Sequence, residues 1–129
     1  MNRYLAVGLG MLLVGMLLGA AAVQTLHAQA KPPAFQIAEV TVNDQEGFTK
    51  EFAPLIAKVI TDGGGKFLAR GGKTFSVQGA APASRLVVVQ FDSVDKMQAL
   101  FNSAAFKQAI AMGDKYATQR VFGVEGVAP

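Results

Sequence analysis

Several stretches of the chain are rich in apolar β-branched and aromatic side chains, a pattern typical of β-strands. The clearest stretch, residues 85–91 (RLVVVQF), is apolar on both faces and is therefore expected at the centre of a sheet. Gly71 and Gly72 interrupt another stretch and indicate a bulge or a tight bend. The predicted strands are residues 35–42, residues 66–70 resuming at 73–78, residues 85–91 and residues 120–124.

Two segments between these strands have apolar residues at the spacing of three to four positions that is typical of a helix. The first helix follows Asp44, an N-cap residue, and Pro54 is expected to kink or split it because proline lacks a backbone N–H. The second helix follows Ser93 and is interrupted at Asn102, where Ser103 is expected to begin a new helix as its N-cap. The apolar face of the first helix consists of Phe48, Phe52, Leu55, Ile56, Val59 and Ile60.

The resulting order is strand–helix–strand–strand–helix–strand, which predicts an α+β fold of the ferredoxin-like β-α-β-β-α-β type. In this plait two helices cover one face of an antiparallel sheet and leave the other face bare. Because both faces of the strand at residues 85–91 are apolar, the bare face is expected to need a partner. We therefore predict a homodimer in which two sheets stack and enclose a small cavity.

The N-terminal segment has the features of an export signal. Arg3 supplies a positive start, residues 5–23 are apolar and uncharged, and Ala28-Gln29-Ala30 provides a small-x-small cleavage site. We expect cleavage near Ala30 and a periplasmic or secreted protein. The predicted parts are a signal at residues 1–30, a leader at 31–34, the ferredoxin-like domain at 35–126 and a tail at 127–129.

An uncleaved inner-membrane anchor is the alternative interpretation of this segment. The apolar run at residues 5–23 approaches the ~20 residues that a helix needs to span a bilayer. It also contains Gly15-x-x-x-Gly19, a spacing that allows two membrane helices to approach closely. In either interpretation the domain is exported, and any contact with the membrane is made through the N-terminal segment alone.

The composition excludes several kinds of chemistry. The chain has no cysteine and no tryptophan, and its single histidine, His27, lies in the predicted signal. The mature domain therefore lacks the ligands of a His/Cys zinc site, an iron–sulfur cluster or haem, and we expect no metal and no cofactor. The 12 basic and 9 acidic residues are scattered along the chain, so no nucleic-acid partner is expected.

Glu39 is the one candidate for a catalytic residue. It shares a strand face with Phe35 and Ile37, on the side predicted to face the dimer partner, where it is a candidate general base. The simpler interpretation is a structural ion pair with Arg85 or Arg120 at a strand edge. We favour the ion pair, because structural pairs perturb carboxylates as readily as catalysis does.

Further polar residues are candidates for ligand binding. Arg70 and Arg85 are suited to anion recognition, because a guanidinium holds a carboxylate through two parallel hydrogen bonds; the simpler role is a solvent contact at a strand end. Tyr116 can donate a proton or a hydrogen bond to a ligand, but a tyrosine near a helix end is more often a packing residue with a solvated hydroxyl. Asn102 and Ser103 lie at the helix interruption, where they either line a pocket or cap helices.

Three segments together resemble a known family. Residues 67–72 (FLARGG), 85–91 (RLVVVQF) and 101–106 (FNSAAF) resemble domain-of-unknown-function family 1330 in order and spacing, and the resemblance extends from about Phe35 to Gly126. It implies membership of the dimeric α/β-barrel group of ferredoxin-like folds. The third segment in that family usually has the pattern aromatic-x-Ser-Pro-Glu-Tyr, whereas this chain has alanine, alanine and phenylalanine at its last three positions.

These observations predict a homodimer that binds a small apolar or anionic molecule in its barrel cavity, with Glu39, Arg70, Arg85 and Asn102 as the polar residues of the cavity. The loss of the family's glutamate and tyrosine at positions 105 and 106 argues against an enzyme. One alternative is an enzyme similar to the cofactor-free monooxygenases or isomerases of the same fold group, with Glu39 as base. The other is a structural envelope protein.

Overall fold

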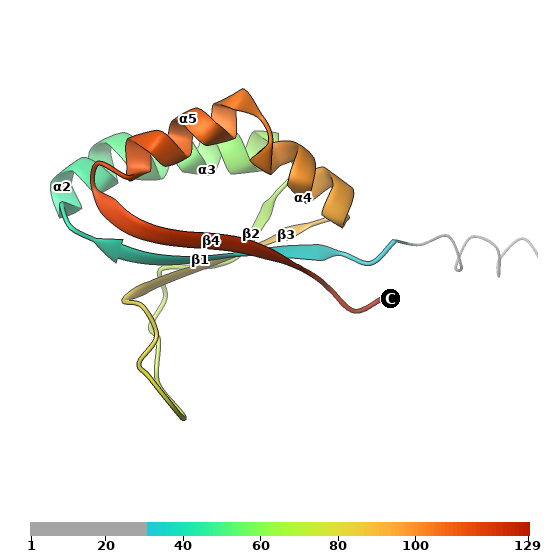
Figure 1. Ribbon diagram of the computed structural model, residues 1–129, viewed down its shortest axis with the longest axis horizontal. Helices are drawn as coiled ribbons and strands as arrows, with labels where there is room; N and C mark the ends of the chain where they lie inside the picture. The colour runs from blue at the N-terminus through green and yellow to red at the C-terminus, as the bar shows by residue number, and fades with distance from the viewer. Residues whose placement is uncertain (1–30) are drawn as a thin grey trace, which may run out of the picture. The chain divides into compact units, whose positions relative to one another are not determined.

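The computed structural model describes residues 31–129, so the predicted signal or anchor at residues 1–30 lies outside the described residues. Four strands form one antiparallel sheet in the order β2-β3-β1-β4, and the helices lie over one face of it (Figure 1). This arrangement confirms the ferredoxin-like α+β fold and the central position of the third strand. The strands are β1 (Ala34–Val42), β2 (Lys66–Arg70), β3 (Arg85–Phe91) and β4 (Ala117–Glu125).

The central strand β1 has a strict alternation of burial. Its inward positions carry mostly small residues and are buried against the helices, whereas Phe35, Ile37 and Glu39 are partly exposed on the other face. In the antiparallel register, Val40 lies opposite Arg85 of β3 and Gln119 of β4. The buried inward residues are Ala34, Gln36, Ala38 and Val40.

The first helical region is continuous but changes its hydrogen-bond pattern before Pro54. It consists of α2 (Gln45–Gly47), a π-helical turn η1 (Phe48–Phe52) and α3 (Ala53–Asp62). The Ala53 N–H bonds to the carbonyl of Phe48, five residues earlier. The wider turn accommodates a proline that cannot donate to the preceding turn. The predicted kink at Pro54 therefore takes the form of a π-helical turn immediately before it.

The second helical region is divided as predicted. Helices α4 (Val94–Phe101) and α5 (Ala104–Gly113) each begin at a serine N-cap. The Oγ of Ser93 accepts a hydrogen bond from the backbone N–H of Lys96 at 3.3 Å, and the Oγ of Ser103 accepts one from the N–H of Phe106 at 3.2 Å. The core between these helices and the sheet includes the fully buried Phe91, Ile60 and Val89.

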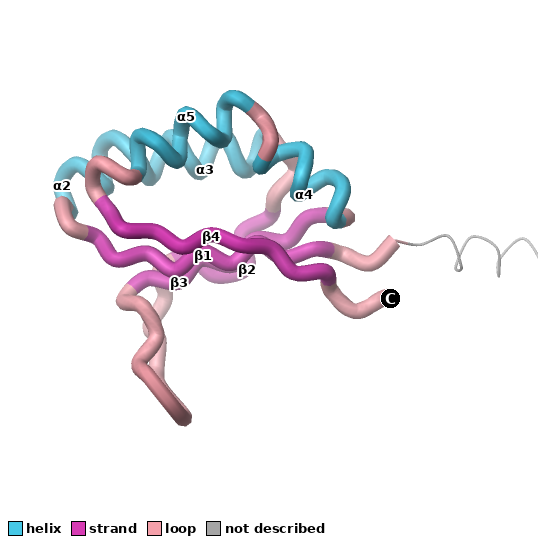
Figure 2. Tube along the Cα trace, viewed as in Figure 1, coloured by secondary structure: helices cyan, strands magenta, loops and turns pink. Residues whose placement is uncertain are grey.

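Two predicted strand boundaries require correction. Residues 73–78 form no strand but belong to a loop, residues 71–84, that extends away from the sheet on the side opposite the helices (Figures 1 and 2). We call this loop the arm. β2 ends at Arg70 and Gly71, at φ +69, turns the chain out of the sheet, so the arm's backbone has no strand beside it to pair with. The last strand begins at Ala117, three residues earlier than predicted.

We predict that Ser103→Ala lowers the free energy of unfolding by about 1 kcal/mol, because it removes the side-chain cap of α5. Urea denaturation monitored by circular dichroism measures this loss. Ser76→Ala is the matched control, since Ser76 is an exposed residue of the arm and should change the stability little. Equal stability of the two variants would show that the cap contributes nothing.

Candidate functional site

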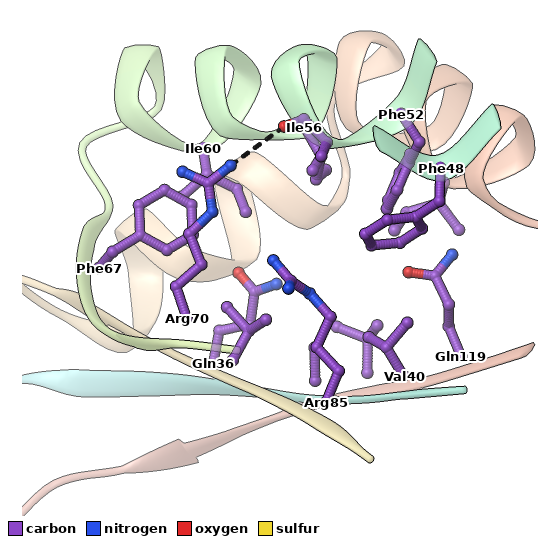
Figure 3. Close-up of a pocket in the computed structure, with 15 residues that line it drawn as sticks. Gln36, Val40, Phe48, Phe52, Ile56, Ile60, Phe67, Arg70, Arg85 and Gln119 are labelled. Atoms are coloured by element: carbon purple, nitrogen blue, oxygen red, sulfur yellow. Dashed lines mark hydrogen bonds between the residues drawn. The ribbon is translucent and has the colours of Figure 1, made fainter. Parts of the chain in front are cut away.

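A pocket lies between the inward face of the sheet and the helical elements η1, α3 and α5 (Figure 3). Ala38 lies at its floor in a row with Val87 and Val121, and the short alanine side chain leaves space above β1. Aromatic and aliphatic side chains form most of the remaining wall. The positions open to the centre of a water molecule fill about 40 Å³ of it, which leaves room for a small or narrow ligand.

Four polar side chains enter this apolar space: Gln36, Arg70, Arg85 and Gln119 (Figure 3). Three of their atoms are buried and have no hydrogen-bond partner in the described protein: Oε1 of Gln36, Nε of Arg85 and Nε2 of Gln119. A buried polar atom without a partner costs about 1–3 kcal/mol, so such atoms are rare without a structural or functional reason. Their concentration in one pocket makes it the candidate site.

Arg85 is held at the pocket by its strand position and by the glycine beside it. It is the first residue of β3 and points inward, where its guanidinium lies 5.3 Å from the centre of the Phe48 ring. A side chain at position 71 would collide with this guanidinium, so Gly71 makes room for it. Burial lowers the pKa of Arg85, and the nearby positive charge of Arg70 lowers it further.

Arg70 brings a second positive charge to the same pocket. Its Nη2 donates a hydrogen bond to the carbonyl of Ala53 at 3.3 Å, and its guanidinium lies 4.8 Å from the centre of the Phe67 ring. Within residues 31–129 neither Arg70 nor Arg85 forms an ion pair, and the pocket lining contains no acidic residue. Arg70 is exposed to solvent and Arg85 is half-buried, so two guanidinium groups without an acidic partner lie beside an apolar space, an arrangement that favours an anion.

Sequence reasoning identified the two arginines but missed Gln36 and Gln119. Gln36 carries a readable signal, because it is a polar residue on a strand face shared with Ala38 and Val40. Its side chain is 2% exposed. Gln119 lies before the predicted start of the last strand. The sheet face on which its side chain lies could therefore not be derived from the alternation of side chains along a strand.

Glu39 lies on the uncovered face of the sheet, away from the pocket. Its Oε2 accepts a hydrogen bond from Nε of Arg120 at 2.6 Å, and the two residues are direct neighbours across β1 and β4. This hydrogen bond lowers the pKa of Glu39; desolvation opposes it in part, and the charge of Arg120 adds a smaller lowering. Of the two ion-pair partners predicted for Glu39, the structure therefore contains Arg120.

The remaining candidates lie outside the pocket. Asn102 is exposed at the end of α4, and Ser103 caps α5 while its Oγ donates a hydrogen bond to the carbonyl of Leu100 at 2.6 Å. The Tyr116 ring packs against Gly47, and its backbone carbonyl accepts hydrogen bonds from two N–H groups before α2. These contacts are structural. The pocket itself lies within a single chain, whereas the sequence analysis expected a cavity between two copies.

Two further observations concern the whole of residues 31–129. In that part of the chain no helix combines the length and the hydrophobicity needed to cross a membrane. Nor do these residues contain a cluster of three or more His, Cys, Asp or Glu side chains arranged to hold a metal ion.

A four-stranded antiparallel sheet with helices on one face and a polar-lined pocket beneath them places this chain among the ferredoxin-like α+β proteins. Residues 33–127 match the family described as Domain of unknown function (DUF1330). The chain belongs to this family.

Solved structures with the same fold include proteins of several kinds. RPA0582, a protein of unknown function from Rhodopseudomonas palustris, is similar with a TM-score of 0.60 and 12% identity over 84% of this chain and 94% of that chain. SnoaB, a cofactor-independent oxygenase from Streptomyces nogalater, is similar with a TM-score of 0.54 and 11% identity over 76% of this chain and 96% of that chain. At these identities the similarity establishes the fold alone. A comparison with curated proteins gives no match.

We predict that Arg120→Gln raises the pKa of Glu39 toward its ordinary value, because the substitution removes the hydrogen bond and charge that lower it. A lowered pKa means that the ion pair is present at neutral pH and is lost as the pH falls through the folded-state pKa. Carboxyl-carbon NMR titration measures the shift. Arg70→Gln, on the opposite face, is the control and should leave this titration unchanged.

Proposed function

We propose that this protein is an exported homodimer that binds a small molecule with an apolar body and an anionic group in the pocket of each protomer. The observation that carries the proposal is the pair Arg70 and Arg85, two guanidinium groups without an acidic partner among residues 31–129. The apolar walls supply contact area, and the few polar atoms supply orientation, as is usual in small-molecule sites.

Binding is supported better than acid–base catalysis. The pocket lining contains no Asp, Glu, His, Cys or Tyr, so the pocket walls offer none of the usual proton acceptors. Glu39, the base required by the enzymatic alternative, is engaged with Arg120 on the other face of the sheet. The shared fold with SnoaB is an analogy of architecture and assigns no reaction to this chain.

The homodimer is supported by apolar surface that one protomer leaves exposed. The uncovered face carries the large side chains Leu68, Phe122 and Val124, which are 49%, 41% and 51% exposed. The arm adds Phe75 and Val77, 78% and 89% exposed, on the same side of the sheet (Figure 1). A second copy stacked on this face would cover the exposed apolar side chains of the sheet and of the arm. By symmetry, the arm of each copy would lie beside the partner's sheet.

Export is supported by the sequence of residues 1–30, which combines a positive start, an apolar run and an Ala-Gln-Ala site. Cleavage near Ala30 would place the mature domain in the periplasm or outside the cell. Without cleavage, residues 5–23 would anchor it to the inner membrane.

We predict that hexanoate binds in the pocket and that Arg85→Met weakens this binding by about tenfold or more, because it removes a charge-assisted hydrogen bond. Arg70→Met should weaken it as well. Chemical-shift titration of the labelled protein provides both the affinity and the location. Shifts should cluster at pocket residues such as Ala38 and Ile56.

Two controls isolate the role of charge in this experiment. Hexanamide has the same apolar chain without the anion, so its weaker binding should change little in Arg85→Met. Lys107→Met removes a positive charge from an exposed position on α5 outside the pocket and should leave hexanoate binding unchanged. Equal binding of hexanoate and hexanamide by the wild-type protein would contradict an anion site.

We predict that native mass spectrometry of the protein isolated from the exported fraction gives a dimer of chains beginning at Lys31. Phe122→Lys should shift it to monomers, because the substitution places a charge in the uncovered apolar face. Leu55→Lys is the matched control, since Leu55 is 38% exposed on the helix side. A wild-type monomer would refute the dimer, and a full-length chain would refute cleavage.

A further inference from the structure

We propose that Gln36 is a positioning residue for Arg85: its amide oxygen accepts a hydrogen bond from the guanidinium and fixes the direction in which this group presents its charge to the ligand. The inference rests on the proposed function, because it concerns the anion site of the same pocket. It follows from the burial of the Gln36 amide and from the direction of the Arg85 side chain (Figure 3).

The Arg85 side chain extends along the sheet toward Gln36. Arg85 lies opposite Val40 of β1, and Gln36 lies on the same inward face four residues before Val40. Ala38 lies between these positions, and its short side chain leaves the path along the strand open. Figure 3 shows the guanidinium extending along β1 toward the amide of Gln36, whereas Gln119 lies apart. The long side chain of Arg85 therefore brings its N–H groups to Gln36.

The Gln36 amide is buried, and its oxygen needs a hydrogen-bond donor. The residue is 2% exposed, and within residues 31–129 its Oε1 has no partner. A half-turn of the amide about its Cγ–Cδ bond exchanges the oxygen and the nitrogen within the same volume. This rotation turns Oε1 toward the guanidinium of Arg85 without a change in packing. The hydrogen bond then satisfies a buried acceptor that bulk water does not reach.

The surroundings of the guanidinium leave one edge for a ligand. Phe48 covers one face, with its ring centre 5.3 Å away, and a side chain at Gly71 would collide with Nη1. Gln36 lies beyond the tip of the group. The Nε is buried and has no partner among residues 31–129. A guanidinium held in this way offers Nε–H and the neighbouring Nη–H side by side, an arrangement that binds the two oxygens of a carboxylate.

The neutral charge of Gln36 is as important as its oxygen. Burial lowers the pKa of Arg85, because desolvation disfavours the charged form. An amide oxygen replaces part of the lost hydration and leaves the positive charge in place. A carboxylate at position 36 would instead neutralise this charge and compete with an anionic ligand. Glutamine is thus a residue type that orients the arginine while its charge stays available to the ligand.

The first test observes Arg85 in the full-length protein without a ligand. Side-chain ¹⁵N NMR measures the rotation of the guanidinium about its Nε–Cζ bond, which hydrogen bonds slow, and the signal lost in Arg85→Lys identifies the residue. We expect rotation to be about threefold faster or more in Gln36→Met, which removes the acceptor but keeps the length of the side chain. Gln108→Met, at an exposed position on α5, should leave it unchanged. Equal rates in the wild type and Gln36→Met would overturn the proposal.

The second test changes the charge at position 36. Gln36→Glu should keep the rotation of Arg85 slow, because a carboxylate is a stronger acceptor, yet weaken hexanoate binding by about a hundredfold, because it neutralises the guanidinium. Gln36→Met should weaken hexanoate binding by about threefold to tenfold. Binding of the uncharged hexanamide should change little in either variant.

The two tests separate this inference from the proposed function. Unchanged hexanoate binding in Gln36→Glu would overturn the positioning role and leave the anion site intact. If the wild-type protein binds no hexanoate, the proposed function fails, and the rotation of Arg85 in Gln36→Met still decides whether Gln36 holds the guanidinium.

Discussion

The pairing of β1 with β3 on one side and with β4 on the other determines which side chains enter the pocket and which reach the uncovered face. Because side chains alternate along a strand, a shift of one residue would exchange the two sets. Gln36 would then leave the pocket, and Glu39 would enter it. The buried alanines and valines of the inward face oppose such a shift, since their burial against the helices requires the observed register. The chemistry of the pocket thus depends on the same register as the stability of the core.

The pocket departs from the packing rules that the rest of the core obeys. Elsewhere apolar side chains fill the space between sheet and helices, with Phe91 and Val89 almost completely buried. In the pocket, Ala38 leaves space, and polar atoms face it without partners. Gly113 has a related role, because a side chain there would collide with Phe52 and with the amide of Gln119. Local violations of packing and hydrogen bonding within an otherwise consistent fold are typical of functional sites.

Local signals in the sequence were sufficient for most of the fold but for only half of the site. Runs of β-branched and aromatic residues identified β1 and β3, and the serine caps at Ser93 and Ser103 identified the starts of α4 and α5, since these signals act within a few residues. The strand expected at residues 73–78 failed, because a strand also needs a neighbour with which to pair. For the same reason the direction of Gln119 could not be derived, as its place in β4 depends on pairing with β1.

The departure from the family pattern at residues 104–106 has a structural explanation and does not bear on the chemistry of the pocket. Ser103 is the N-cap of α5, so the family's Pro-Glu-Tyr would occupy the first turn of this helix. Proline is favoured at the first helical position and glutamate near the N-terminus, and alanine preserves the helix at both. Phe106 is buried, with its ring centre 5.1 Å from that of Phe101, and does not line the pocket. The absence of the glutamate and the tyrosine therefore gives no evidence for or against an enzyme. The argument for binding depends instead on Arg70 and Arg85, which the family resemblance also includes.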